Sequence, residues 1–590
     1  MPRPWRLRPT PPDAERTLAR DAGVHQVVAR VLANRGIADP ELARTHLALR
    51  ADLMHEPLLV PGMAAACERL SRAVDGGETI LVHGDYDVDG VCGTALLVRL
   101  LRHVGANVRW HIPNRLVDGY SFGAHSVERA RAEGASVVLS VDNGTSAFET
   151  IHELRELGID TVVTDHHEAP LPHPEFGALP PAAAIVNPKL EPRTYPWPEL
   201  CGTAVAFKLA WGLLKHRSGG ERVDAAAKRL LESQMALAAL ATVCDVVPLR
   251  DENRVLVHYG LKALRHLPTA GLAALCEVAK LDGRTPTAEE VAFQIGPRIN
   301  AAGRLGAADR AVELLLTDDG ALARRIAGEL DALNQERKLV EREVLREALA
   351  EAERFACPDE HPMLVLAGQG WHQGVVGIVA ARLTERFARP ALVIGLDGDR
   401  GRGSARTFGD VDVLGATRAA DGHFERYGGH EQAAGCEIEA SRVDAARDAI
   451  NAALREKKER ETHAAALLDI DCELPFAQMD EGLMRQLESP EPFGKENERP
   501  VFLSTDLRPR RRAAPRRPGR RALLAAPSRR GPHVLVRYGL RPGRAHRRAS
   551  APRRPCNVVY SPRWNTFRGA TNLEIEALDF RCGLDAAPVS

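Results

Sequence analysis

The chain has 590 residues, 44% of them hydrophobic and 27% charged, which is the composition of an ordinary globular protein with room for three or four domains. Lys and Arg balance Asp and Glu overall, but residues 508–555 contain 17 Arg and no Lys, Asp or Glu, so the rest of the chain has a net charge of −17. A uniformly basic surface is therefore excluded, and a nucleic acid would have to bind in local basic grooves.

Cysteine usage and the absence of targeting patterns indicate a cytoplasmic protein. The ten cysteines are scattered without a C-x-x-C pair, which suits a reducing compartment and argues against a zinc ribbon or a disulfide scaffold. The basic start lacks an apolar signal-peptide core, and no uncharged apolar run reaches the roughly 18 residues of a membrane span. We expect a cytoplasmic monomer with no membrane partner.

Residues 1–50 predict a helical segment, and short apolar runs then alternate with helix-like stretches. The runs occupy residues 79–87, 107–115, 136–144, 160–167 and 182–188. Strands that alternate with helices are typical of βαβ units around a parallel sheet. We therefore predict an α/β domain over residues 51–318, in which a buried helix at 224–243 leads into CDVVPL.

Three regions follow this domain. Residues 319–356 are rich in Ala, Leu, Glu and Arg and predict one long charged helix, which usually bridges domains. A smaller α/β domain is expected over 357–456, with strands at 363–368 and 390–396 and the glycine-rich string FERYGGHEQAAGCEIEA. Residues 457–590 form a third region, in which PFGKENERPVFL suggests strands.

Acidic side chains cluster where the first predicted strand ends. The string HGDYDVDG places Asp85, Asp87 and Asp89 at alternate positions, which would share one face if the extended backbone continued. An EF-hand loop also begins D-x-D-x-D-G, but its twelfth residue must be Glu and here is Leu96. A strand-like run, not a helix, also precedes the string, so an EF-hand is excluded.

Other predicted elements end in similar side chains. Asp142 follows SVVLSV, His166 and His167 follow TVVTD, and Asp245 follows the buried helix. Parallel sheets place their sites at the carboxyl ends of strands, so we expect these side chains to meet. Each one alone is equally well an ordinary cap or turn residue. Together they favour two Mn²⁺ or Mg²⁺ ions, because so many carboxylates would otherwise repel one another.

These strings resemble the motifs of the DHH phosphoesterase superfamily, and within it the RecJ family of single-stranded-DNA-specific exonucleases. HGDYDVDG, VDNG, TDHH and CDVVPL match the metal motifs, and GPRINAAGRLG matches the motif that follows them. WHQGVVGIVAARL, GSAR and RYGGHEQAAG match the DHH-associated domain. The resemblance covers about residues 50–505. It implies a DHH-type parallel-sheet domain, a connecting helix, a smaller α/β DHH-associated domain and an oligonucleotide-binding β-barrel.

The resemblance implies that six side chains hold two metal ions, namely His83, Asp87, Asp89, Asp142, His166 and Asp245. The first ion would be held by His83, Asp87 and Asp245. The second would be held by Asp89 and His166, with Asp142 as a bridge. Asp85 and His167 would lie in or beside this ligand sphere, and His167 would orient the scissile phosphate or assist the leaving oxygen.

The remaining motifs are implied to bind the substrate through Arg115, Arg298, Asn300, Arg304, Ser404, Arg406 and His430. We expect Arg298 and Arg304 in a glycine-bounded loop that suits bidentate phosphate contacts. GSAR and the glycines beside His430 would supply a cation and backbone N–H groups for a phosphate. A salt bridge remains the alternative for Arg298 or Arg406, and a plain tight turn the alternative for the glycines.

The function implied is 5′→3′ hydrolysis of single-stranded DNA to 5′-mononucleotides in recombination and repair. Single-stranded DNA would be the substrate, and a single-strand-binding protein and a helicase are candidate partners. Two alternatives stay open: a phosphodiesterase for short oligonucleotides, and a non-catalytic DNA-binding relative. The length and the PFGKENERPVF string count against the former, and the intact ligand set counts against the latter.

Residues 508–555 depart from the resemblance, because Arg, Ala, Pro and Gly dominate and strand alternation is lost. One interpretation is a disordered arginine arm that binds nucleic acid electrostatically. The other is a stretch read out of frame between two compensating frame changes in a GC-rich gene. We favour the second and predict that the barrel is disrupted there, with strand-like sequence resuming at residue 557.

Overall fold

The computed structural model describes residues 4–114, 122–219, 222–460, 467–507, 522–523, 535–538, 556–567 and 570–582. The chain forms two compact units. The first comprises Met1–Ala48, Val340–Glu491 and Arg499–Ser590, and the second comprises Leu49–Leu339 and Pro492–Glu498. Among the helices described, none has the length and apolar character that a membrane crossing needs.

The second unit is built on a five-stranded parallel sheet with the order β3-β2-β4-β5-β6. Its strands are β2 (Thr79–His83), β3 (Asn107–His111), β4 (Val137–Val141), β5 (Asp160–Thr164) and β6 (Ala184–Val186). Each lies within a predicted run but is shorter than it. The predicted parallel α/β domain is therefore confirmed.

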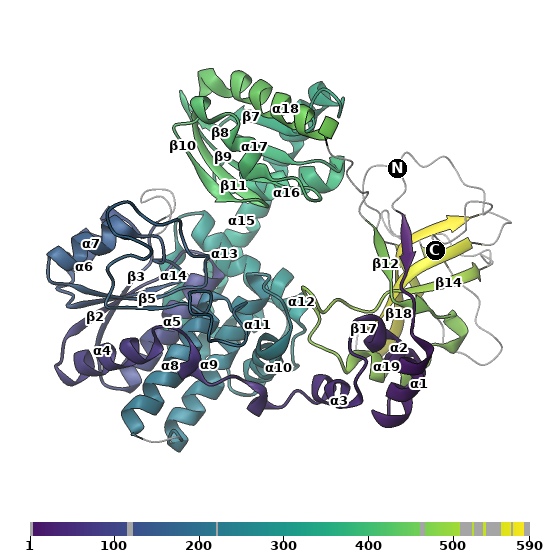
Figure 1. Cartoon of the computed structure of the whole chain (residues 1–590), viewed down its shortest axis with the longest axis horizontal. Coiled ribbons are helices and arrows are strands. Elements are labelled where there is room, and N and C mark those ends of the chain that lie inside the picture. The colour runs from purple at the N-terminus through teal and green to yellow at the C-terminus, as the bar shows by residue number, and fades with distance from the viewer. Residues whose placement is uncertain are drawn as a thin grey trace. The chain divides into compact units, whose positions relative to one another are not determined.

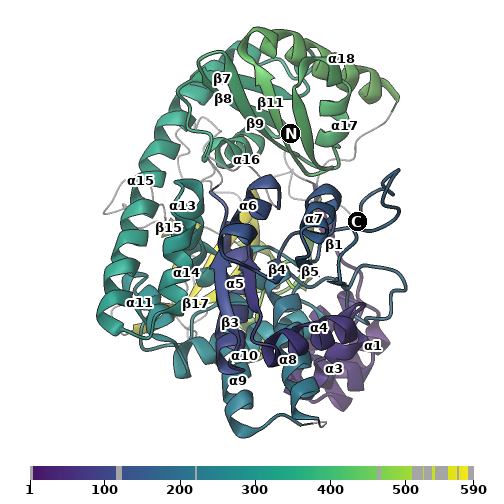
Figure 2. The same ribbon diagram turned by 90° about the vertical axis from the view of Figure 1, so that its left-hand side faces the viewer.

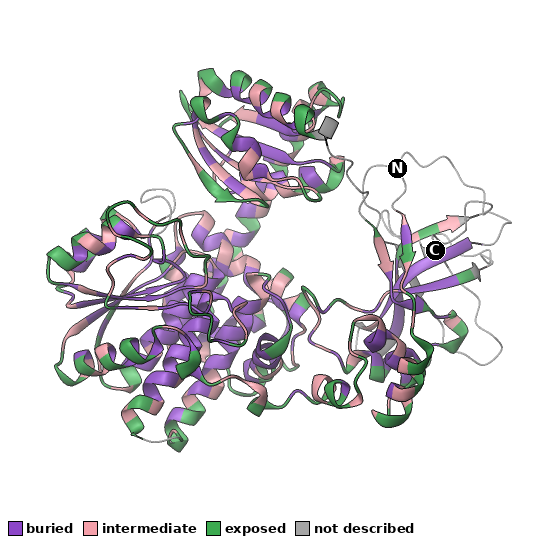
Figure 3. Ribbon diagram, viewed as in Figure 1, coloured by how far each residue is buried: buried purple, intermediate pink, exposed green. Residues whose placement is uncertain are grey.

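Helices cover both faces of this sheet (Figure 1). On one face lie α6 (Ala124–Ala132) and α7 (Phe148–Glu156), which pack on Leu81, Val138 and Val163. On the other face lie α4 (Met63–Asp75), α5 (Val88–His103) and α8 (Gly202–Ser218). Strands β2, β4 and β5 are almost wholly buried (Figure 3), which explains why they read as continuous apolar runs, whereas the edge strand β3 is partly exposed.

Further helices complete the second unit: α9 (Ala225–Cys244), α10 (Asp251–His266), α11 (Ala270–Val278), α12 (Ala288–Glu290), α13 (Gly296–Arg304) and α14 (Ala308–Leu316). The segment 492–498 belongs to the same unit, where Leu249 N–H donates to the carbonyl of Lys495 at 2.8 Å. The string PFGKENE is therefore not a strand, and the next strand begins at Phe502.

The glycine-bounded loop that we expected around Arg298 and Arg304 is wrong, because both residues lie on helix α13. Its glycines serve close packing. A Cβ on Gly296 would lie 2.4 Å from Cys244 Sγ, and one on Gly303 would lie 2.2 Å from the carbonyl oxygen of Tyr86. Glycine was read as a turn signal, whereas here it lets a helix approach its neighbours.

The predicted connecting helix is α15 (Gly320–Ala352), seen along its length in Figure 2. After it comes a five-stranded sheet of order β10-β11-β9-β8-β7. Its strands are β7 (Leu364–Gln369), β8 (Ala391–Asp397), β9 (Arg400–Arg406), β10 (Arg426–His430) and β11 (Ala433–Glu439). Only β7 and β8 pair in parallel. Helix α16 (Val376–Phe387) packs on one face, and α17 (Val413–Arg418) and α18 (Val443–Arg460) on the other.

The N-terminal segment packs with the third predicted region inside the first unit. It contains β1 (Trp5–Leu7), α1 (Pro12–Asp21), α2 (Gln26–Asn34) and α3 (Pro40–Ala48). Strand β1 pairs with β12 (Leu468–Ile470), and the buried Trp5 packs on Ile470 and Val559. This long-range pairing has no local sequence pattern that would predict it.

The third region forms an open six-stranded sheet of order β13-β14-β17-β18-β16-β15 and carries α19 (Glu481–Glu488). Its strands are β13 (Cys472–Glu473), β14 (Phe502–Leu507), β15 (Ala522–Leu523), β16 (Leu535–Tyr538), β17 (Cys556–Phe567) and β18 (Ala570–Cys582). Over the described residues these strands do not close into a barrel.

The arginine-rich segment 508–555 is described only at β15 and β16, which join this sheet. At those six residues, strands form where we expected none. The rest of the segment lies outside the described residues, so the frame-change hypothesis stays a prediction. Cys556 in β17 is disulfide-bonded, whereas eight other cysteines of the described chain are free thiols.

Candidate metal centre

The loop between β2 and α5 holds its acidic residues on a helix N-terminus. Asp87 is the N-cap of α5, and its Oδ1 accepts the N–H groups of Asp89 at 2.9 Å and Gly90 at 3.1 Å. The strand has already ended at His83, so Asp85, Asp87 and Asp89 do not share a strand face as we expected. The cause is the preference of Asp for the N-cap, which starts the helix early.

Asp89 is fixed by a second helix N-terminus. Its carboxylate accepts the N–H groups of Gly202 at 2.7 Å and Thr203 at 2.6 Å, in the first turn of α8. The Thr203 hydroxyl donates to the Asp89 carbonyl at 2.6 Å, and the Asp89 residue is only 2% exposed. Two helix N-termini thus orient neighbouring carboxylates, which their partial positive charge also stabilises.

His166, two residues after the end of β5, lies close to three carboxylates. Its Nε2 lies 3.1 Å from Asp142 Oδ1, 3.8 Å from Asp89 Oδ2 and 3.8 Å from Asp245 Oδ2. These residues come from the ends of β4 and β5, the first turn of α5 and the C-cap of α9. Asp142, His166 and His167 form one group whose possible ligand atoms lie within 4.8 Å of one another, and Asp89, His166 and Asp245 form another.

Asp142 is held in an unusual conformation at the middle of this cluster. Its φ of 62° lies in the left-handed region, which Asp tolerates better than most residues. Helix α8 approaches it so closely that a Cβ on Gly202 would lie 2.7 Å from Asp142 Cβ. Its Oδ1 is buried and has no hydrogen bond, although His166 Nε2 lies 3.1 Å away.

The carboxylates raise one another's pKa values. Burial, followed by the charges of Asp89 and Asp87, raises the pKa of Asp142 well above its usual range. The same causes raise the pKa of Asp245 to about 8, and burial together with Asp89 raises that of Asp87. A cluster that disfavours its own ionisation and buries an unpaired oxygen fits divalent cations bound by oxygen and imidazole ligands. Mn²⁺ and Mg²⁺ have that preference.

Asp165, between β5 and the two histidines, organises this end of the sheet. Its Oδ1 accepts the N–H groups of His166 at 2.8 Å and His167 at 3.2 Å, and contacts His167 Nδ1 at 2.7 Å. Its Oδ2 accepts the N–H of Thr145 at 2.9 Å. Burial opposes its ionisation, but the His167 and Thr145 bonds hold the pKa of Asp165 well below its usual range.

His167 is tied to this carboxylate. Burial lowers the pKa of His167, but the hydrogen bond and charge of Asp165 outweigh burial and raise it to about 9. Asn187 fixes the same corner, because its side chain donates to Thr145 Oγ1 at 3.1 Å and to the His167 carbonyl at 2.9 Å. The His167 side chain is nevertheless 49% exposed, so it remains accessible.

The predicted ligand His83 lies in a different group. It is fully buried at the end of β2 and, among the described residues, joins His111 and His125 in a group of three imidazoles. Burial and these two rings lower the pKa of His83 well below its usual value. The structure therefore does not gather His83 with the carboxylates around His166, and its role as their co-ligand stays a prediction.

Helix α13 supports the acidic loop. Asn300 Oδ1 accepts the N–H of Val88 at 3.1 Å, and the charge of Arg304 opposes the rise in the pKa of Asp87. Arg298 instead forms a salt bridge with Asp331 at 2.8 Å and donates to the carbonyl of Val278 at 3.2 Å. This is the alternative that we weighed for it, and its substrate role stays a prediction.

Arg115 lies outside the described residues. The remaining predicted substrate residues are Ser404, Arg406 and His430. They lie in the first unit, on one face of the sheet β10-β11-β9-β8-β7. Arg406 Nη1 donates to Ser404 Oγ at 2.8 Å on β9, and His430 ends β10 in register with Ala433 of β11. Arg406 is in register with the same Ala433, so His430 and Arg406 flank one end of the sheet.

Two glycines leave this face open. In strands β10 and β11, Gly428 is in register with Gly435, which in turn pairs with Ser404. A Cβ on Gly428 would have no atom within 4 Å, and one on Gly435 would meet only the Gly403 carbonyl at 3.8 Å. Neither has a φ in the left-handed region. Glycine is therefore required there neither by backbone conformation nor by packing, which favours the close approach of a ligand.

Comparison with known proteins decides the family. Residues 79–242 match the DHH family, N-terminal domain, residues 360–456 match the DHHA1 domain, and residues 470–579 match the RecJ OB domain. The chain is 38% identical to the single-stranded-DNA-specific exonuclease RecJ of Escherichia coli over 72% of its own length and 74% of that protein. The chain belongs to the RecJ family.

Other RecJ proteins are similar over comparable spans. Identity is 35% to RecJ of Thermus thermophilus, covering 85% of this chain and 69% of that protein. Identity is 36% to RecJ of Bacillus subtilis, of which this chain spans about half, 54%. The crystal structure of Thermus thermophilus RecJ in complex with Mn²⁺ has a TM-score of 0.81 and 31% identity, covering 98% of this chain and 79% of that one. A second structure of that RecJ contains Mg²⁺ and has a TM-score of 0.76, 30% identity and coverage of 98% and 78%.

In this RecJ chain, sequence reasoning missed the residues that orient others. Asp165 belongs to the TDHH string, in which the sequence predicts a function only for His166 and His167. Its position beside them was the available signal. His111 and His125 were also missed, although His111 lies within a predicted run, as His83 does, and each of the two ends a strand of the structure.

Proposed function

We propose that this RecJ family member is a 5′→3′ exonuclease that hydrolyses single-stranded DNA to 5′-mononucleotides with two bound Mn²⁺ or Mg²⁺ ions. The observation that carries the proposal is the convergence of Asp89, Asp142 and Asp245 on His166 Nε2 from separate elements. The names of the similar RecJ proteins, and the Mn²⁺ and Mg²⁺ in two related structures, support the substrate and the cofactor.

The side chains have distinct tasks in this proposal. Asp89, Asp142, His166 and Asp245 would hold the ions, and Asp87 would complete the set from the N-cap of α5. Bound ions would lower the pKa of a water molecule and offset the charge that develops on the phosphate. The buried, unpaired Asp142 Oδ1 fits a bridging role, because an anionic oxygen in that position needs a cation.

His167 would act on the leaving group. Asp165 holds its ring through Nδ1, which leaves Nε2 as the nitrogen that can face a substrate. In hydrolysis to 5′-mononucleotides, the bond that breaks is between phosphorus and the 3′ oxygen of the released nucleotide. A protonated His167 can donate a hydrogen bond to the phosphate or a proton to that oxygen.

The open face of the second sheet would bind the strand. Ser404, Arg406 and His430 offer a hydroxyl, a guanidinium and an imidazole beside Gly428 and Gly435, where a sugar-phosphate backbone can come close to the sheet. Arginine is well suited to phosphate because its planar donors match two oxygens. We also propose that the enzyme works in the cytoplasm in recombination and repair, with a helicase and a single-strand-binding protein as partners.

The deciding experiment uses single-stranded, duplex and dinucleotide DNA, each labelled at either end, with Mn²⁺ or EDTA. The proposal expects Mn²⁺-dependent release of labelled mononucleotide from the single strand alone, early from the 5′ label and late from the 3′ label. Asp142→Asn serves as the inactive control. Cleavage of the dinucleotide alone would indicate the short-oligonucleotide alternative, and binding without release would indicate the non-catalytic one.

A further inference from the structure

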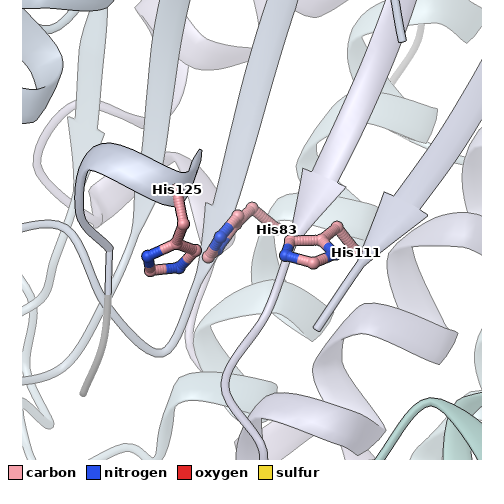
Figure 4. Close-up of side chains that lie close together, drawn as sticks. All are labelled: His83, His111 and His125. Carbon is pink, nitrogen blue, oxygen red and sulfur yellow. The ribbon is translucent and has the colours of Figure 1, made fainter. Parts of the chain in front are cut away.

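Three histidines from different elements converge beside the acidic loop. His83 and His111 end the neighbouring parallel strands β2 and β3 and are in register, and His125 lies in the first turn of α6 (Figure 4). Their ring centroids form a nearly regular triangle, 5.3 Å between His83 and His111, 5.9 Å between His83 and His125 and 6.3 Å between His111 and His125. One ligand nitrogen of each lies within 4.8 Å of the other two.

This triangle has nearly the size of a three-imidazole metal site. With a metal–nitrogen distance of about 2.1 Å, each ring centroid lies roughly 3.2 Å from the ion, and three such rings lie about 5.2–5.6 Å apart. The His83–His111 spacing of 5.3 Å lies within this range, and the spacings of 5.9 Å and 6.3 Å to His125 exceed it by less than about 1 Å. A small inward movement of His111 and His125 therefore closes the site without a change of fold.

A second observation points to a ligand. His83 is completely buried, and its Nδ1 has no hydrogen-bond partner. Its Nε2 is 2.9 Å from Ser126 Oγ, which also lies 3.2 Å from His125 Nε2 and accepts the N–H of Gly123 at 3.1 Å. If Ser126 accepts the Nε2 proton of His83, Nδ1 carries a buried lone pair. Metal-binding histidines are typically oriented in this way, by a hydrogen bond from the other ring nitrogen.

We propose that His83, His111 and His125 form a separate binding site for a borderline divalent cation such as Zn²⁺, with water as the remaining ligand. Imidazole-only sites suit Zn²⁺, Co²⁺ or Ni²⁺, whereas the carboxylate centre suits Mn²⁺ and Mg²⁺, so the two sites select different ions. The bound ion joins β2, β3 and α6 immediately before the acidic loop. Its effect is to stabilise the loop's entry strand, and it takes no part in the phosphoryl chemistry.

The test measures how many Zn²⁺ ions bind to the full chain. The protein is first stripped of metal with EDTA and then dialysed against Zn²⁺ in a large excess of Mg²⁺, and the Mg²⁺ occupies the carboxylate centre. Asp142→Asn, which damages that centre, should still bind one Zn²⁺ per chain. Adding His111→Ala or His125→Ala should weaken this binding by at least about 100-fold, whereas His103→Ala, an exposed histidine on α5, should leave it unchanged. Co²⁺ in place of Zn²⁺ should give the strong visible absorption of a four-coordinate ion.

The outcomes separate the proposal from its rivals. If Asp142→Asn abolishes Zn²⁺ binding, the ion occupies the carboxylate centre and the proposal is overturned. Unchanged stoichiometry in a folded His111→Ala or His125→Ala variant overturns it as well. Should either variant fail to fold, Asp142→Asn alone decides the matter, because the absence of one Zn²⁺ and of the Co²⁺ absorption there contradicts the site.

Discussion

Replacing Asp165 with Asn tests whether one buried carboxylate organises the catalytic histidines. The change removes one charge and keeps the shape, but Asn has one acceptor oxygen and one NH₂ donor. In the protein, one Asp165 oxygen serves three donors from His166 and His167, and the other accepts the N–H of Thr145. Either orientation of the amide therefore sets its NH₂ against a buried N–H group.

The expected cost follows from these contacts. If the Asn oxygen faces the histidines, the Thr145 bond is lost and two donors face each other in a buried corner. Loss of a hydrogen bond to a charged group is worth about 1.5–3 kcal/mol, and a buried unsatisfied donor costs about 1–3 kcal/mol. Because the contacts to His166 and His167 weaken but survive, we expect about 3 kcal/mol less stability. Misplacement of the two histidines should lower activity by about 10–100-fold.

Urea unfolding in EDTA measures the stability, and release of labelled nucleotide at saturating Mn²⁺ measures the activity. Asp160→Asn is a matched control, because Asp160 begins the same strand β5 but is 49% exposed, and its partner Arg69 keeps a second salt bridge to Glu78. Such a pair is worth at most about 1 kcal/mol. If Asp165→Asn resembles Asp160→Asn in both measurements, Asp165 does not position the histidines and the reasoning fails.

Three further changes test the centre and the substrate face. Asp142→Asn should lower turnover by at least about 1,000-fold. In EDTA the variant should melt no lower than wild type, because the raised pKa of Asp142 means that its charge destabilises the metal-free protein. Mn²⁺ should raise the melting temperature of wild type much more than that of the variant. His167→Asn should lower the free energy of unfolding in EDTA by about 1–2 kcal/mol below pH 6.5, a modest value because the His167 side chain is half exposed. This difference should vanish as the pH rises through about 9, where wild-type His167 loses its proton. A pH-independent difference would contradict the pairing of His167 with Asp165. Gly435→Val should weaken single-stranded DNA binding, measured by fluorescence anisotropy, while leaving the stability nearly unchanged. Gly403→Val should instead lower the stability, because a Cβ at Gly403, on the opposite face of the sheet, would lie 2.7 Å from Cys436 Sγ. The reverse pattern would refute the assignment of the open face.

Local patterns predicted the parallel sheet, because buried strands leave continuous apolar runs that can be read directly. They also predicted which carboxylates follow the strands. They failed where a residue type serves two physical purposes. Gly296 and Gly303 suggested a loop, but they lie in α13 and are small because Cys244 and Tyr86 approach closely. Only the tertiary structure distinguishes a glycine that bends the chain from one that makes room.

His83 shows the other limit. The resemblance implies that it shares a metal site with the carboxylates, and this stays a prediction, whereas its neighbours His111 and His125 are set by strand register and by the start of α6. The sequence of neither strand alone determines the register between β2 and β3. The same holds for the N-terminal segment, whose β1 pairs with the distant strand β12, as Trp5 opposite Leu468 shows.

The carboxylates of the centre differ in how the fold compensates their charge. Asp87 and Asp89 accept backbone N–H groups at the N-termini of α5 and α8. No such bond to Asp142 or Asp245 is found among the described residues, and burial with the neighbouring charges raises the pKa of both. A helix N-terminus stabilises a nearby negative charge by roughly 0.3–2 kcal/mol, which is too little to offset the mutual repulsion of four neighbouring carboxylates. The remaining charge therefore has to be balanced by bound cations, and it is concentrated on Asp142 and Asp245, which both lie within 3.8 Å of His166 Nε2.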